Sequence, residues 1–82
     1  MSESDSDDTG LKPSEIMSQS HFRLELTEAI PHMRAFARSL TGDAASADDL
    51  AQDALMKAWS ARAKFKAGTN FRAWVLTIVR NQ

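Results

Sequence analysis

The chain has 82 residues, enough for one small domain whose stability should be marginal, because a chain of this length buries only about 60% of its unfolded surface. It contains no cysteine, which excludes disulfides and cysteine-based zinc sites. His21 and His32 have no second ligand at helical spacing, so we expect no metal and no cofactor. The first twenty residues are acidic and polar and no apolar run approaches roughly 20 residues, so we expect no signal peptide, no membrane segment and a cytoplasmic location.

Charge is distributed unevenly along the chain, although the net charge is only −1. Residues 1–20 hold five acids against the single base Lys12, whereas no acid occurs from Ala54 onward. The six bases of this C-terminal part are Lys57, Arg62, Lys64, Lys66, Arg72 and Arg80. The asymmetry indicates either a surface that contacts a polyanion or an ordinary solvated basic rim.

Residues 1–19 are expected to form a disordered acidic leader ahead of one folded domain over residues 20–82. The leader is rich in Ser, Asp and Glu, contains Gly10 and Pro13, and has no aromatic side chain with which to join a core.

A first helix is predicted over residues 21–41, with Gly42 as its C-cap. Apolar side chains recur there at steps of three and four residues, as in an amphipathic helix. They are Phe22, Leu26, Ala29, Ile30, Met33, Phe36, Ala37 and Leu40. Pro31 removes one backbone donor, so the helix either kinks there or gives way to a new helix. A kink is favoured because the stripe keeps its phase across the proline.

A second helix is predicted to begin at Ser46, because Ser46-Ala47-Asp48-Asp49 resembles a capping box with acids in the first turn. Its apolar face consists of Leu50, Ala51, Ala54, Leu55, Ala58, Trp59 and Ala61. The many alanines indicate that another helix approaches closely.

A connector containing Gly68 precedes a third predicted helix, for which Thr69 or Asn70 is the N-cap. The apolar stripe of this helix consists of Phe71, Trp74, Val75, Ile78 and Val79. No stop signal follows before Gln82, so we expect the native chain to continue. Three amphipathic helices with short loops predict an all-α fold, a helical hairpin plus a third packing helix that is truncated at its C-terminal end.

The outer side of the second helix carries a polar stripe opposite the alanines. It consists of Asp49, Gln52, Asp53, Met56 and Ser60. Carboxylates and an amide at fixed spacing can bind arginines and backbone groups of a partner helix, and Met56 supplies adaptable apolar contact. The alternative is an ordinary solvated face.

The aromatic residues and the acids of the second helix could be taken for a base-stacking surface and a catalytic site, but the sequence favours a structural role for both groups. The helical phase of Trp59 and Trp74, together with Phe65 and Phe71, predicts core packing rather than a platform for stacking nucleobases. The acids of the second helix have no nucleophile, phosphate loop or histidine beside them in the sequence, so we expect no catalytic residue and no enzyme.

Three motifs in order resemble the extracytoplasmic-function (ECF) sigma factors. Residues 49–59 (DLAQDALMKAW) resemble region 2.2, and residues 33–43 (MRAFARSLTGD) resemble region 2.1. The start of the promoter-reading segment is resembled by Phe65, residues 69–74 (TNFRAW), Ile78, Arg80 and Asn81. The similar residues run from Phe22 to the end. Residues 30–40 (IPHMRAFARSL) and 68–70 look like the EcfG-type sigma factors of the general stress response in alphaproteobacteria.

The resemblance implies a sigma region 2 fold, a role in transcription initiation, and particular roles for individual residues. The outer stripe, Asp49, Gln52, Asp53, Met56 and Ser60, would bind the β′ clamp helices of core RNA polymerase. Arg72, Arg80 and Asn81 would contact the minus-ten element of promoter DNA, with Asn81 near a flipped base. An anti-sigma factor, NepR-like if the subgroup holds, would regulate the protein.

Two alternatives remain open on the sequence. One is the sigma-like domain of an anti-anti-sigma response regulator, which would sequester an anti-sigma factor. The other is a helical interaction module with no role in transcription. The intact pair Gln52 and Asp53, together with the acid-free basic C-terminal part, favours a working sigma factor.

Overall fold

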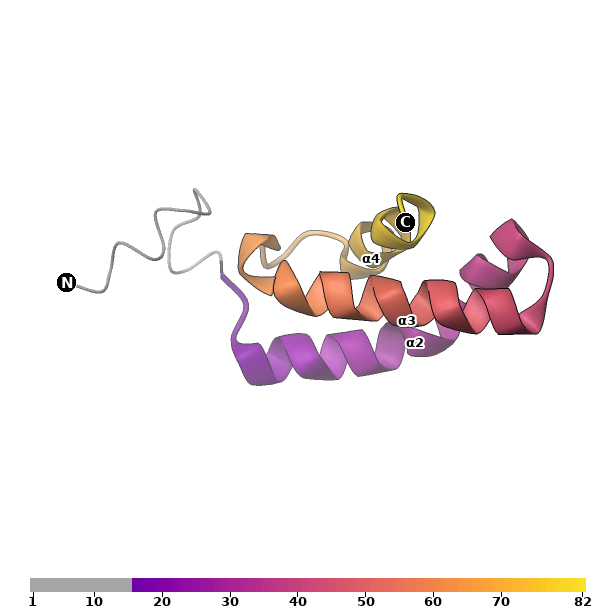
Figure 1. Cartoon of the computed structure of the whole chain (residues 1–82). Coiled ribbons are helices and arrows are strands. Elements are labelled where there is room, and N and C mark those ends of the chain that lie inside the picture. The colour runs from indigo at the N-terminus through magenta and orange to yellow at the C-terminus, as the bar shows by residue number, and fades with distance from the viewer. Residues whose placement is uncertain (1–15) are drawn as a thin grey trace.

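The computed structural model describes residues 16–82, which form three α-helices and one short 3-10 helix. The helices are α2 (Gln19–Thr41), α3 (Ala44–Ser60) and α4 (Phe71–Arg80), and η2 (Arg62–Lys64) lies between the last two. Figure 1 shows α2 and α3 as a hairpin, with α4 lying across it and contacting both helices. The predicted all-α fold, a hairpin plus a third packing helix, is confirmed for this part of the chain.

The expected leader overlaps the described part only at its end. Residues 1–15 lie outside the described residues, whereas residues 16–19 take part in the fold. Ile16 forms an isolated antiparallel β-bridge with Lys66, and the Ser18 hydroxyl caps α2 by accepting a hydrogen bond from the His21 N–H at 3.2 Å. Because of this cap, α2 begins two residues earlier than the sequence predicted.

Helix α2 runs as a single helix through Pro31, so the alternative of a new helix that opens at the proline is wrong. Figure 1 shows the second half of α2 leaving the line of the first half as it passes behind α3. Gly42 ends the helix with φ 86° and donates its N–H to the Arg38 carbonyl at 2.9 Å. Only a residue without Cβ adopts this left-handed conformation at little cost, so the predicted glycine C-cap is confirmed.

The tip of the hairpin projects beyond the core, and one predicted core residue is wrong for that reason. Leu40 continues the apolar stripe of α2 in sequence, but its side chain is 48% exposed. All residues from 38 to 46 are exposed, because α4 covers the hairpin farther from its tip (Figure 1). The last buried layer at this end consists of Ala37 and Ala47.

The N-cap of α3 is Asp43, and the prediction of Ser46 was wrong. The chain leaves Gly42 with Asp43 in an extended conformation, and a carboxylate oxygen of Asp43 accepts the Ser46 N–H at 2.9 Å. Hydrogen bonds from the Ser46 backbone and then its side chain hold the pKa of the Asp43 carboxyl below its ordinary value. Ser46 is therefore the partner of the cap, one turn inside the helix.

Small side chains form the contact between the two long helices. Four alanines of α3 at steps of three and four residues are buried, and two alanines of α2 are buried with them. They are Ala47, Ala51, Ala54 and Ala58 of α3, and Ala29 and Ala37 of α2. The predicted close approach of a helix to the alanine-rich face is confirmed.

Aromatic rings fill the other end of the core, where the connector joins α3 to α4. The ring of Phe22 lies at its centre, with centroids 5.1–6.2 Å from those of Trp59, Phe65, Phe71 and Trp74. Three of these four contacts are near edge-to-face, which is a favourable arrangement of aromatic quadrupoles. The predicted core role of these aromatic residues is confirmed.

Helix α4 is held by its cap and by one apolar side. The Asn70 side chain accepts the Ala73 N–H at 3.0 Å, and Phe71, Val75 and Val79 are buried against the hairpin.

Within residues 16–82, no helix combines the length and apolar character that crossing a membrane requires.

Candidate functional site

The structure places the predicted polar stripe of α3 on the solvent side of the hairpin. Its five members, which we call the α3 stripe, are all exposed; they are Asp49, Gln52, Asp53, Met56 and Ser60. Met56 is 65% exposed, more than Leu24 or Leu40, the other two strongly exposed large apolar side chains of the described residues. Met56 gives the otherwise polar stripe one flexible apolar side chain, which can adapt its shape to the surface of a partner.

Shallow hollows lie on both sides of Met56. On the side of α4, Asp53, Met56, Lys57, Ser60 and Gln82 line one of them. On the side of α2, Leu26, Leu55, Met56, Trp59 and Ser60 line the other, which is mainly apolar. Met56 therefore lines both hollows, and this surface can take side chains of a partner helix on either side of Met56.

The adjacent residues Gln52 and Asp53 face different neighbours. Gln52 lines a hollow between α2 and α3 together with Arg34, Asp48 and Leu55. Asp53, in contrast, lies on the side of the C-terminal end of α4. The stripe therefore extends around the whole exposed side of α3, between α2 at one edge and the chain end at the other.

The end of α4 brings the predicted DNA-binding residue Asn81 beside the C-terminal half of α3. Asn81 and Gln82 line a hollow together with Lys57, Ser60 and Lys64. An amide near two ammonium groups suits a nucleic acid, because lysines bind phosphates and an amide can hydrogen-bond a base edge. Arg80, in the last turn of α4, is exposed close by in the chain.

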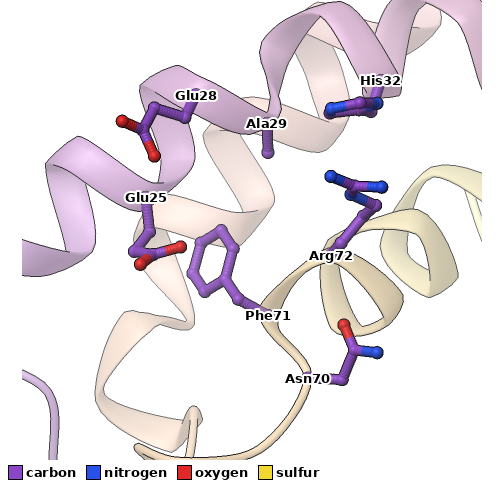
Figure 2. A pocket seen from close by; sticks show the side chains of 7 residues that line it. All are labelled: Glu25, Glu28, Ala29, His32, Asn70, Phe71 and Arg72. Carbon is purple, nitrogen blue, oxygen red and sulfur yellow. The ribbon is translucent and has the colours of Figure 1, made fainter.

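Arg72 lies apart from the other two predicted DNA-binding residues. It is at the start of α4, eight residues before Arg80, which corresponds to about 12 Å along a helix. Figure 2 shows Arg72 pointing toward His32 of α2, in a notch that Glu25 and Glu28 also line. The two carboxylates make this notch a poor phosphate site, so the three predicted residues do not form one cluster.

The described residues show neither a metal site nor a buried reactive group. Among residues 16–82, no group of three or more His, Asp and Glu side chains is placed to hold a metal ion. Buried polar or charged residues are also absent from the core of this part of the chain.

The family described as sigma-70 region 2 matches residues 26–82, which cover α3, α4 and most of α2. The chain belongs to the sigma-70 region 2 family. This sigma region 2 chain is 46% identical over 59 residues to the ECF RNA polymerase sigma factor EcfG of Rhodopseudomonas palustris (strain TIE-1), and the aligned part covers 72% of the chain and 33% of that protein. The predicted resemblance to ECF sigma factors of the EcfG type is confirmed.

A solved structure shows the same similarity in three dimensions. The sigma region 2 chain is similar to the sigma factor RpoE from Bartonella quintana, solved in complex with the anti-sigma factor NepR, with a TM-score of 0.70 and 48% identity. The match covers 74% of this chain and 38% of RpoE. The chain therefore spans between 33% and 38% of the length of these two relatives.

Reasoning from the sequence missed the basic neighbours of the α3 stripe in this sigma region 2 domain. The sequence analysis placed Lys57 and Lys64 in a basic C-terminal part without assigning them to a site, yet they share a hollow with Asn81. The helical phase of Lys57, one residue after Met56, could have indicated its place beside the stripe. The place of Lys64 depends on the η2 turn, which no sequence pattern predicted.

Proposed function

We propose that this chain is region 2 of an ECF sigma factor, whose α3 stripe binds the β′ clamp helices of core RNA polymerase and whose C-terminal end contributes to recognition of the minus-ten element. The observation that carries the proposal is the exposed stripe itself, with Met56 at 65% exposure on a helix whose opposite side is packed through alanines. The buried alanines determine which side of α3 faces solvent, so the side chains of the stripe are accessible to a partner.

The chemistry of the stripe fits a coiled coil that presents arginines. Asp49 and Asp53 accept charge-assisted hydrogen bonds, which are about twice as strong as neutral ones. The Gln52 amide both donates and accepts, so it can pair with a side chain or with an exposed backbone group. Met56 adapts its shape to apolar side chains that enter the hollow beside Leu55 and Trp59.

The C-terminal end supplies groups suited to single-stranded promoter DNA. Extruding a base costs a few kcal/mol, and phosphate contacts together with a polar base contact must offset it. Asn81 would provide the polar contact, and Lys57, Lys64 and Arg80 would provide positive charge nearby. Arg72 is not included in this surface, because it lies at the other end of α4 in a notch with Glu25 and Glu28.

We predict that Asp53→Lys weakens binding of a β′ clamp-helix fragment by about 1–3 kcal/mol, because the charge-assisted contact proposed for the Asp53 carboxylate is lost. Isothermal titration of the fragment into the 82-residue chain measures the change. Glu28→Lys is the matched control, since it makes the same charge change at an exposed site of α2, in the notch beside Arg72.

The control should bind like the parent chain, and circular dichroism should show that both variants remain helical. Equal affinities for the parent and Asp53→Lys would remove the assignment of the stripe. Equal losses in both variants would mean that only the net charge of the domain matters.

A NepR-like anti-sigma factor is the second partner that we propose, because RpoE, which is 48% identical in the matched part, was solved with NepR. Covering the α3 stripe would be a direct way to block polymerase. We expect such a protein and the clamp-helix fragment to compete for the domain in a pull-down, with each displacing the other. A stable complex that contains both on one copy of the domain would contradict this assignment.

A further inference from the structure

The methionines of the described residues differ strongly in their access to solvent. Met56 of the α3 stripe is 65% exposed, whereas Met33 on α2 is fully buried and Met17 is half-buried against the core. The chain has four methionines and no cysteine, so the sulfur that a dissolved oxidant meets is methionine sulfur. Within residues 16–82, the sulfur of Met56 is therefore the most accessible to oxidation.

The neighbours of Met56 make a polar oxygen on its side chain unfavourable for a contact with a partner. On the α2 side, Met56 borders the mainly apolar hollow, where Leu26 and Leu55 offer an oxygen no hydrogen-bond donor. On the α4 side, it shares a hollow with Asp53, whose carboxylate only accepts hydrogen bonds and so repels another acceptor. Lys57 is a donor in that second hollow, but a side chain that turns toward it leaves the apolar hollow unfilled.

We propose that Met56 is a modification site, at which oxidation of the thioether to a sulfoxide reversibly weakens the contact of the α3 stripe with the β′ clamp helices. The oxidant is a hydroperoxide. The sulfur lone pair attacks one peroxide oxygen, so an S–O bond forms while the O–O bond breaks, and the electron pair that sulfur gives up reduces the peroxide. The other oxygen leaves with the peroxide's proton as an alcohol, or as water when the oxidant is hydrogen peroxide. A flexible apolar side chain thus becomes a polar, chiral one.

The choice of Met56 as the oxidised sulfur is tested on the 82-residue chain without any partner. Trypsin releases Met33 in residues 24–34 and Met56 in residues 39–57, so mass spectrometry after a brief treatment with hydrogen peroxide follows each sulfur separately. In the folded chain we expect Met56 to be oxidised roughly tenfold or more faster than Met33, because Met33 reacts only when the domain opens. In urea the two rates should become similar. Equal rates in the folded chain, or the same difference in urea, would overturn the assignment.

The effect on binding is tested by titrating the β′ clamp-helix fragment into the chain before and after oxidation, and this part rests on the proposed function. We expect oxidation to weaken binding roughly fivefold or more, because a sulfoxide oxygen held in an apolar contact lacks the hydrogen bonds that water gives it. Methionine sulfoxide reductases for both sulfoxide epimers should restore the affinity.

Two leucine variants identify the methionine that is responsible. Met56→Leu has an apolar side chain of similar size that peroxide does not oxidise, so its affinity after treatment should equal its own affinity before treatment. Met17→Leu is the matched control, because it removes a half-buried sulfur and retains Met56. It should lose affinity on oxidation as the parent does.

Unchanged affinity of the oxidised parent would overturn the proposal. An equal loss in oxidised Met56→Leu would also overturn it, since another side chain would then be responsible. Circular dichroism should show that the oxidised chain stays helical, and a loss of helix would contradict an effect confined to the surface. If the unoxidised parent does not bind the fragment, the proposed function fails together with the regulatory part of this proposal, whereas the rates at Met56 and Met33 still decide the site of oxidation.

Discussion

Phe22→Ala is expected to leave most of the protein unfolded at room temperature. The Phe22 ring is 1% exposed and packs against four other rings, from α3, the connector and α4. Removing a buried phenylalanine costs about 3–5 kcal/mol. A core in a chain of this size rarely supplies more than about 3–5 kcal/mol of stability, so this one ring accounts for most of the margin.

Urea denaturation followed by circular dichroism measures the loss, and Leu24→Ala is its matched control. Leu24 lies two residues away on the same helix but is 56% exposed, so its truncation should change the free energy of unfolding by less than about 1 kcal/mol. A folded Phe22→Ala variant with a loss as small as that of the control would show that the aromatic cluster does not hold the three helices together.

The helices themselves could be predicted because each has a continuous apolar side that the sequence displays directly. The ends could not be predicted equally well. Asp43 and Ser46 are both good N-caps, and the choice between them depends on Gly42, whose left-handed conformation delivers Asp43 to the start of α3. The local sequence shows which residues are able to cap the helix. The geometry of the preceding turn determines which of them does so.

The candidate site also has one part that local sequence predicts and another part that depends on tertiary packing. The exposed side of the α3 stripe follows from the phase of one helix, so the sequence was sufficient to predict it. The hollow that joins Ser60 and Lys64 to Asn81 is formed by segments about twenty residues apart, and only the packing of α4 creates it. Arg72 and Arg80, which the sequence analysis grouped as DNA-binding residues, are separated by the length of α4 itself, and the packing of α4 on α2 places Arg72 beside Glu25 and Glu28.

Met33→Ala is expected to cost about 2–5 kcal/mol, whereas Leu40→Ala should cost less than about 1 kcal/mol. The two residues are seven apart and occupy the same phase of α2, so the sequence predicts the same burial for both. In the structure Met33 is fully buried, while Leu40 is 48% exposed at the tip of the hairpin.

Thermal denaturation of the two single variants measures how much stability each side chain contributes. The comparison shows whether this contribution depends only on the side of the helix that the residue occupies or also on its position along the hairpin. A large loss at Met33 and a small one at Leu40 follow if a side chain is stabilising only where α4 closes the core over the hairpin. Equal and large losses would mean that another part of the protein covers Leu40, and the tip would then belong to a further contact. Equal and small losses would mean that the core around Met33 collapses to fill the space, which close packing of the alanines of α3 opposes.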